Sequence, residues 1–170
     1  MNKKNIGYVT IEFDNQIKQT INAWARKEIK DDYIYTEVIE GKIEGGIATD
    51  KLHLTLFYGF DNNNINRKEL QNYLNKIDLR EIEIECISSF PIFGKGARVL
   101  IFKVNDINGV LKKIHFELAN FPNFSAFQKF EYVPHITIAY IKDSVNIAKL
   151  SHHFPQKILV HNFEYHVTIK

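Results

Sequence analysis

Two segments of the chain, Leu52–Tyr58 and Pro134–Tyr140, repeat one pattern, and this repeat limits the possible folds more than any other feature of the sequence. Each segment contains a histidine, a threonine two positions later and a tyrosine five positions after the histidine, with apolar residues in between. Alternation of polar and apolar residues over such a length is typical of a half-buried β-strand. The sequence therefore predicts two strands with apolar backs, each of which displays an imidazole and a hydroxyl on its polar face.

The polar faces of the two strands carry His53 with Thr55 and His135 with Thr137. Because successive side chains point to opposite faces of a strand, each histidine shares a face with the threonine two residues after it. The opposite faces carry aliphatic residues and are expected to pack on a core. Two strands of this kind suit a polar groove formed where two halves of the protein meet.

The other predicted elements are strands and helices in mixed order. Further strands are expected at 6–13, 80–88, 97–105, 157–160 and 163–169, and helices are expected after the first strand, at 67–77 and at 107–120. Asn66 is expected to cap the second helix, and segment 41–46 is expected to be a glycine-containing connection. Strands and helices do not alternate regularly and no linker divides the chain. The prediction is therefore one α+β domain, 1–170, with antiparallel sheets flanked by helices.

Composition is typical of a soluble globular protein. Of the 170 residues, 45% are hydrophobic and 25% are charged, which argues against both a disordered chain and a membrane protein. The most notable apolar run is Val99–Phe102, far shorter than the roughly 20 residues that span a bilayer, and no signal-type segment follows Met1. We therefore expect a cytoplasmic protein, located in the host cytoplasm if a phage encodes it.

The formal net charge of +2 is too small to predict binding to duplex DNA, which calls for a concentrated basic face. It is compatible with a small ligand that contains phosphate.

Two conspicuous residues are expected to serve packing. Cys86 is the single cysteine, so it cannot form an internal disulfide, and strand alternation places it on the same side as Ile82 and Ile84 as a small buried hydrophobe. Trp24 shares helical spacing with Ile21 and is assigned to the core rather than to a ligand platform.

Two histidines on facing strands suit general acid–base catalysis at phosphorus. One neutral imidazole removes a proton from an attacking hydroxyl or water, while a second, protonated imidazole gives a proton to the leaving oxygen. Histidine has an unperturbed pKa of about 6.5, so both forms are accessible near neutral pH. The hydroxyls of Thr55 and Thr137 could hydrogen-bond the non-bridging phosphate oxygens and stabilise the charge that builds there. This scheme needs no metal.

A third match, His166 with Thr168, is a warning that a single His-x-Thr pair can arise by chance. Threonine favours strands, and an isolated histidine is more often structural than catalytic. The first two matches are distinguished by their matching apolar neighbours and tyrosines. His166 lacks the later part of the pattern, because the sequence ends at Lys170, and it is left outside the predicted catalytic pair.

The paired motifs resemble those of the two-histidine (2H) phosphoesterase superfamily, and the likeness covers most of the chain. Proteins of this superfamily have a duplicated, bilobal α+β fold in which two His-x-Thr/Ser motifs lie on facing strands. The resemblance implies two pseudo-symmetric lobes with a central groove. It also implies that His53 and His135 are the catalytic histidines and that Thr55 and Thr137 bind the phosphate.

Within the superfamily, the chain is most similar to the anti-CBASS nucleases of bacteriophages, which cleave the cyclic di- and trinucleotide signals of bacterial antiphage defence. This resemblance implies that Tyr8, on the first strand, and Glu164, on a C-terminal strand, belong to the substrate pocket. Tyr8 could equally be a half-buried strand aromatic, and Glu164 a solvent-facing charge. The implied reaction is attack of a ribose 2′-hydroxyl on the adjacent 3′–5′ phosphate, followed by hydrolysis of the 2′,3′-cyclic phosphate to a linear 3′-phosphate.

Aromatic and basic residues outside the motifs are candidates for contacts with bases and with a second phosphate. Phe93 and Lys95 share a loop, in which Phe93 could stack on a base and Lys95, or Arg98 nearby, could bind a phosphate. The alternatives are loop packing for Phe93 and simple solvation for Lys95. A run of aromatic residues is expected to pack beneath the second motif; it consists of Phe121, Phe124, Phe127, Phe130 and Tyr132.

No cofactor and no metal are expected, because the sequence has no cluster of carboxylates and histidines with metal-ligand spacing. The pair His152–His153 has no such partner.

The expected partner is a cyclic oligonucleotide or a short RNA-like phosphodiester, with neither a membrane nor duplex DNA involved. Other enzyme classes of the same superfamily stay open: a 2′,3′-cyclic phosphodiesterase or 2′–5′ RNA ligase-like enzyme, and a 2′,5′-oligoadenylate phosphodiesterase. An enzyme acting on tRNA-like ends is expected to be more basic than this chain. A non-catalytic nucleotide-binding module is a further alternative, although both histidines and both threonines are intact.

Overall fold

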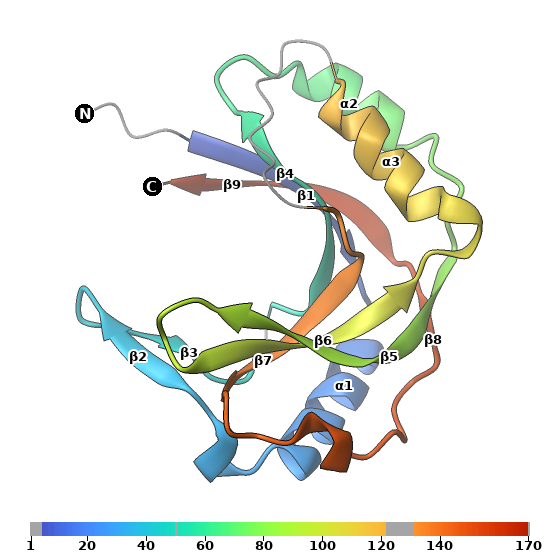
Figure 1. The fold of residues 1–170 in the computed structure, drawn as a ribbon. Helices are drawn as coiled ribbons and strands as arrows, with labels where there is room; N and C mark the ends of the chain where they lie inside the picture. Colours follow the sequence, from blue (N-terminus) through green and yellow to red (C-terminus); the bar gives the residue numbers. More distant parts are fainter. Residues whose placement is uncertain (1–4, 50, 122–130, 170) are drawn as a thin grey trace.

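The computed structural model describes residues 5–49, 51–121 and 131–169, and its main feature is a curved antiparallel sheet of seven strands (Figure 1). The strand order across the sheet is β8-β5-β6-β7-β4-β1-β9. These strands are β1 (Asn5–Glu12), β4 (His53–Asp61), β5 (Glu81–Ile92), β6 (Ala97–Asn105), β7 (His135–Lys142), β8 (Lys157–Leu159) and β9 (Asn162–Ile169). The predicted α+β class with mainly antiparallel strands is confirmed.

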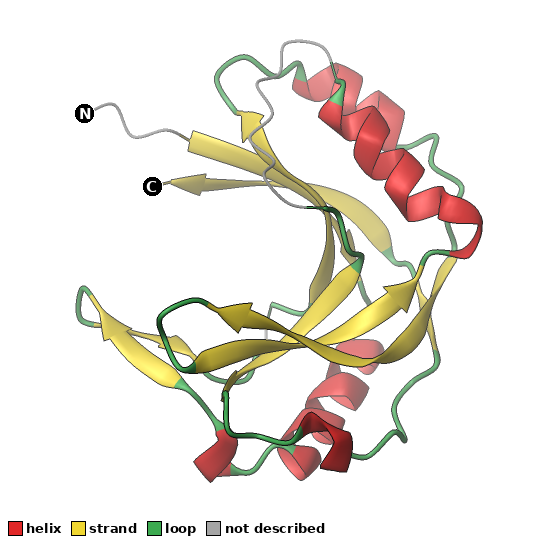
Figure 2. Cartoon of the chain, in the orientation of Figure 1, coloured by secondary structure: helices red, strands yellow, loops and turns green. Residues whose placement is uncertain are grey.

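Among the described residues, three helices lie on the convex side of the sheet (Figure 2). They are α1 (Asn15–Glu28), α2 (Arg67–Leu74) and α3 (Val110–Ala119), with short 3-10 turns at Asp31–Tyr33, Ile107–Gly109 and Ile147–Lys149. Helix α1 packs behind β7, and α3 packs behind β4. Within the three described ranges, no helix is long and apolar enough to cross a membrane.

The boundaries of α2 and α3 differ from the predicted ones, and one predicted cap is confirmed. Asn66 caps α2 by accepting a hydrogen bond of 3.2 Å from the backbone of Glu69, but the helix ends at Leu74 instead of residue 77. The prediction that the third helix starts at residue 107 was wrong. Asn108 and Gly109 both have positive φ, 59° and 68°, which ends the 3-10 turn before α3 begins.

The segment predicted to be a connection at 41–46 contributes instead to a β-hairpin. Strands β2 (Thr36–Ile39) and β3 (Lys42–Gly45) pair with each other outside the main sheet. The two turn residues, Glu40 and Gly41, have φ values of 50° and 77°, as a two-residue hairpin turn requires. Glutamate is not typical of this turn, so Gly41 was the one residue of the turn pair that indicated a hairpin.

The predicted orientation of Cys86 was also wrong. Ile84 pairs with Val104, but the next pair in register is Cys86 with Lys103, so β5 has one extra residue at this point. An inserted residue of this kind, a β-bulge, reverses the faces of the residues that follow. Cys86 therefore lies on the opposite side of the sheet from Ile84 and is half-buried.

The core fills the space between the convex side of the sheet and the helices. Trp24 of α1 is 7% exposed and its ring centroid lies 4.9 Å from that of Phe102 on β6, which confirms the assignment of Trp24 to the core. Phe102 is fully buried and also stacks on Phe154, at 4.8 Å.

We predict that Phe102→Ala lowers the free energy of unfolding by about 3–5 kcal/mol, because the change removes buried apolar contacts and leaves a cavity. Phe93→Ala is the matched control, since the Phe93 side chain is 87% exposed and its truncation should cost almost nothing. Urea denaturation of both variants measures the difference. Equal losses would contradict the assignment of Phe102 to the core.

Candidate functional site

The two His-x-Thr motifs meet where β4 pairs with β7. Leu54 lies opposite Ile136 in this antiparallel pair, and both side chains are fully buried on the core side. Each of these residues is the central one of its motif, so the flanking histidine and threonine point to the concave side. Because the strands run in opposite directions, the histidine of each motif lies on the same side of the Leu54–Ile136 pair as the threonine of the other.

All four motif residues are half-buried and face the concave side of the sheet; they are His53, Thr55, His135 and Thr137. The burial pattern is the same in both strands: from the histidine onward the residues are half-buried, buried, half-buried, buried and buried. This identity at the level of structure extends the repeat seen in the sequence.

Simple alternation would place the tyrosine of each motif on the core side, because five residues separate it from the histidine. In both strands a shift in register reverses this alternation after the threonine, so the tyrosine faces the concave side. Thr55 pairs with Thr10, and the next pair that faces the concave side is Tyr58 with Tyr8. On β7 the register with β6 likewise shifts between Thr137 and the following pairs, and Tyr140 pairs with Val99. The sequence showed the tyrosines but gave no signal for the bulges that turn them to the concave side.

Both histidine rings are held by the backbone two residues before them. The Nδ1 of His135 lies 2.7 Å from the carbonyl oxygen of Val133, and His53 forms a hydrogen bond with the backbone of Lys51. A carbonyl oxygen can only accept, so Nδ1 of His135 carries a hydrogen and its Nε2 is the atom left for acid–base chemistry. The ring of His135 also meets the edge of Phe90 at a centroid distance of 5.0 Å.

Burial lowers the pKa of both histidines below the ordinary value. For His135 the burial is opposed by the hydrogen bond to Val133. For His53 the burial is opposed by the charge of Glu12, while the charges of His166 and Lys18 lower the pKa further. Both imidazoles are therefore poised to exist largely in the neutral form near neutral pH.

Tyr8 of β1 lies beside the first motif, and its role in a substrate pocket stays a prediction. Its ring centroid is 6.4 Å from that of His53 and 5.8 Å from that of Tyr58. It also stacks on the imidazole of His166 at 5.0 Å. Strand β1 thus places the aromatic side chain of Tyr8 next to the imidazole of His53.

His166, which the sequence reasoning left outside the catalytic pair, lies on the same face of the sheet as His53. Its Nε2 is 3.0 Å from the hydroxyl of Thr10, 3.5 Å from Oε1 of Glu12 and 3.6 Å from Oε2 of Glu164. Glu164 is exposed and accepts a hydrogen bond of 2.9 Å from the side-chain amide of Asn162. The sequence showed His166 as part of a third His-x-Thr match. Its proximity to His53 becomes visible only from the order of the strands in the folded sheet.

Glu12, Glu164 and His166 place their ligand-type atoms within 4.8 Å of one another. The sequence-based reason for expecting no metal, the lack of such a cluster, therefore does not hold in three dimensions. These atoms are engaged with other groups of the protein: Lys18 forms an ion pair of 3.1 Å with Glu12, and Thr10 donates to Glu12 at 2.8 Å.

Phe93 and Lys95 lie far from the histidines along the sheet. Their loop follows β5 and precedes Ala97, whereas His135 pairs with Lys103, six residues further along β6, or about 20 Å of extended strand. Phe93 is 87% exposed, and the ammonium of Lys95 forms an ion pair with Glu37 of β2. The structure does not bring these two residues together with the motifs.

The remaining candidates have structural partners or lie outside the described residues. Arg98 donates to the carbonyl of Asp143 at 2.8 Å. Phe121 is buried, and the hydroxyl of Tyr132 donates to the backbone carbonyl of Thr55, whereas Phe124, Phe127 and Phe130 fall within the residues that are not described. His152 and His153 are exposed.

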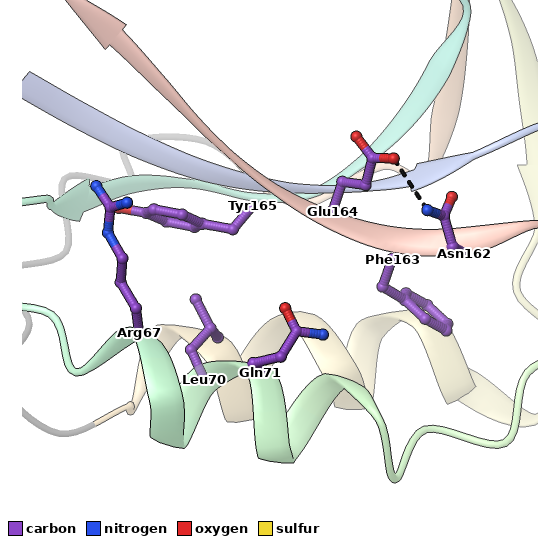
Figure 3. Close-up of a pocket in the computed structure, with 7 residues that line it drawn as sticks. All are labelled: Arg67, Leu70, Gln71, Asn162, Phe163, Glu164 and Tyr165. Carbon is purple, nitrogen blue, oxygen red and sulfur yellow. Dashed lines mark hydrogen bonds between the residues drawn. The ribbon is translucent and has the colours of Figure 1, made fainter.

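A cavity of about 510 Å³ lies between α2 and β9, away from the four motif residues (Figure 3). Arg67, Leu70 and Gln71 of α2 form one wall. Figure 3 shows that Phe163 of β9 points toward α2, whereas Glu164 points away from it. The cavity therefore belongs to the helix-covered side of β9, whereas the four motif residues face the other side of the sheet.

Comparison with known proteins finds similarity in structure and not in sequence. No family model matches the chain, and no curated protein matches its sequence. A phosphoesterase structure is similar with a TM-score of 0.58 and 16% identity, covering 96% of this chain and 88% of that chain. Escherichia coli LigT complexed with phosphate is similar with a TM-score of 0.57 and 17% identity, covering 98% of this chain and 88% of that one.

Usb1 from Kluyveromyces marxianus is similar with a TM-score of 0.50 and 14% identity, covering 84% of this chain and 73% of that chain. At these identities the likeness is one of fold. The chain has the α+β fold of these proteins, with its strands and helices matched over nearly its whole length.

We predict that the imidazoles of His53 and His135 titrate with midpoints below about 6.5, the ordinary value for histidine, because burial disfavours their charged forms. The unfolded chain takes up these protons at higher pH than the folded chain, so stability falls as the pH drops below about 6.5. A ¹H–¹³C NMR titration measures the midpoints. Midpoints above that of a histidine-containing peptide would contradict the burial of the two rings.

Proposed function

We propose that this protein is a metal-independent phosphodiesterase that cleaves the 3′–5′ linkages of cyclic di- or trinucleotides by two-histidine acid–base catalysis. The observation that carries the proposal is the pairing of Leu54 with Ile136, which sets the motifs of β4 and β7 side by side on one face of the sheet. A phosphate lying over this pair can meet one imidazole on each side. This arrangement suits general acid–base catalysis at phosphorus, in which one group accepts a proton and a second group donates one.

The proposed reaction has two steps in which the protons balance. In the first step the ribose 2′-oxygen bonds to phosphorus and passes its proton to the neutral histidine, while the bond to O5′ breaks and O5′ takes the proton of the charged histidine. This step leaves a 2′,3′-cyclic phosphate and a 5′-hydroxyl. In the second step water attacks phosphorus and the bond to O2′ breaks. The histidines then exchange roles, and both return to their starting forms with a linear 3′-phosphate as the product.

The threonines and the tyrosine of β1 have supporting roles in this scheme. The hydroxyls of Thr55 and Thr137 share the face of the histidines and can donate to non-bridging oxygens of the phosphate, where negative charge builds. Tyr8 offers an aromatic ring 6.4 Å from His53, close enough to contact the nucleoside attached to that phosphate.

The similar structures support a ligand that contains phosphate. Escherichia coli LigT has been solved in complex with phosphate, 3′-AMP, ATP and NADP⁺. The shared fold and the paired motifs make a nucleotide phosphodiester the best-supported substrate class for this chain. The sequence resemblance to phage anti-CBASS nucleases, together with the location of Tyr8 and Glu164 on the motif-bearing face, favours the cyclic oligonucleotides within that class.

A 2′,3′-cyclic phosphodiesterase is the second candidate, because the second step of the proposed reaction is itself the hydrolysis of a 2′,3′-cyclic phosphate. The two candidates share both histidines and both threonines. They differ in whether the protein can bind a cyclic oligonucleotide and perform the first step.

We predict that His53→Ala and His135→Ala each reduce turnover by roughly 10²- to 10⁴-fold, the usual cost of losing a proton-transfer group. The exposed His152→Ala is the matched control and should keep full activity. Circular dichroism establishes that each variant is folded. Turnover retained in either motif variant would contradict the mechanism.

We predict that the protein, in the presence of EDTA, converts a 3′–5′ cyclic dinucleotide to a linear 3′-phosphate and binds the 2′-deoxy analogue without cleaving it. The analogue lacks the internal nucleophile, so the first step is blocked. Mass spectrometry identifies the products.

Three other outcomes would each correct one part of the proposal. Equal cleavage of the deoxy analogue would indicate direct attack by water. Activity lost in EDTA and restored by Mg²⁺ or Mn²⁺ would overturn metal independence. Hydrolysis of 2′,3′-cyclic mononucleotides alone would favour the second candidate.

A further inference from the structure

Strand β1 lies between β4 and β9 and connects His53 to the third histidine of the concave face. In the register of the sheet, Glu12 of β1 lies opposite His53 of β4, and Tyr8 of β1 lies opposite His166 of β9. Thr10 lies between them and is fully buried. A row of side chains on one strand thus connects the two imidazoles.

The protons in this row can be assigned from the donors and acceptors. The hydroxyl of Thr10 donates its one hydrogen to Oε1 of Glu12 at 2.8 Å. Its oxygen can then only accept from His166, whose Nε2 lies 3.0 Å away, so Nε2 of His166 carries a hydrogen. The order of donation is therefore from His166 to Thr10 to Glu12, and it ends on a carboxylate.

Glu12 is held in its charged form although it is largely buried. Burial alone would raise its pKa, but the hydrogen bonds from Thr10 and Lys18, and the charges of Lys18 and His53, lower it below the ordinary value. The side chain of Glu12 is 14% exposed, so the surrounding water screens its charge only partly. A fixed negative charge therefore lies opposite His53.

The surroundings of His135 differ. Its ring is held by the carbonyl of Val133 and the edge of Phe90. The residue opposite it on β6 is Lys103, whose ammonium is paired with Glu85 at 2.9 Å. The positive charge opposite His135, that of Lys103, is thus balanced by Glu85, whereas a negative charge lies opposite His53.

We propose that Glu12 is a positioning residue that favours the protonated form of His53 over that of His135, so that in the reactive form of the site His53 gives the proton to the leaving O5′ in the first step and His135 accepts the proton of the 2′-hydroxyl. This assignment rests on the proposed function and adds the division of roles that two like motifs leave open. His166 and Lys18 act in the opposite direction to Glu12, because their positive charges disfavour the imidazolium of His53. Tyr8 is a further titratable group beside this ring.

The test compares the full-length protein with Glu12→Gln and His166→Gln in a pH profile of kcat/KM for a cyclic dinucleotide. The high-pH limb of the profile reports the group that must be protonated, which is His53 in this proposal. Glu12→Gln should move this limb to lower pH and reduce activity above the optimum by roughly tenfold or more. His166→Gln should move the same limb to higher pH, and neither change should move the low-pH limb.

Glu69→Gln provides the matched control, since it makes the same chemical change at an exposed position on α2. Glu12→Asp keeps the carboxylate and should restore most of the wild-type profile, which separates the charge from the shape of the side chain. A shift of the low-pH limb in Glu12→Gln would assign His53 as the base and overturn the proposal. Unchanged limbs in both Gln variants would overturn it as well.

An NMR titration of the His53 ring in the wild type and in Glu12→Gln does not depend on turnover. A midpoint that falls in Glu12→Gln supports the coupling between Glu12 and His53, and an unchanged or raised midpoint refutes it. If the wild type cleaves no phosphodiester but the midpoint falls, the proposed function fails and the coupling stands. The two failures are therefore distinguishable.

Discussion

The site depends on one pair of buried residues, Leu54 and Ile136, because this pair joins β4 to β7 and so unites the two halves of the sheet. On one side lie β8, β5, β6 and β7 with α1 behind them, and on the other lie β4, β1 and β9 with α2 and α3 behind them. A slip of this pairing by one residue would turn one motif into the core. Burial of the two aliphatic side chains therefore keeps both histidines on the same face.

The rest of the concave face is built around this pair by irregularities in the strands. Bulges in both motif strands return Tyr58 and Tyr140 to the face of the histidines, and a bulge in β5 moves Cys86 to it. Strand β1 adds a charged row next to β4, from Glu12 to His166. The two motifs are alike in sequence and in burial, but their neighbours are not. We infer that these neighbours, and not the motifs themselves, divide the acid and base roles.

Much of the fold could be predicted from the sequence, because period and capping are local signals. The strand at 97–105 and the cap at Asn66 are as predicted, and α+β class followed from the order of elements. The parts that could not be predicted depend on register and strand order. Three features produce no periodic pattern in the sequence. They are the bulge before Cys86, the two positive-φ residues that precede α3, and the short distance between His166 and Glu12. The sequence predicted Lys95 as a phosphate ligand. Strand β2 was not predicted, and its Glu37 forms an ion pair with Lys95.

A crystal structure of the protein with a nucleoside 3′-phosphate would show directly whether the two motifs form one phosphate site. We expect the phosphate to lie over the Leu54–Ile136 pair, with its oxygens within hydrogen-bond distance of His53 and His135 and of the two threonine hydroxyls. A phosphate bound instead in the cavity between α2 and β9, with both histidines out of its reach, would refute the assignment of His53 and His135 to the active site.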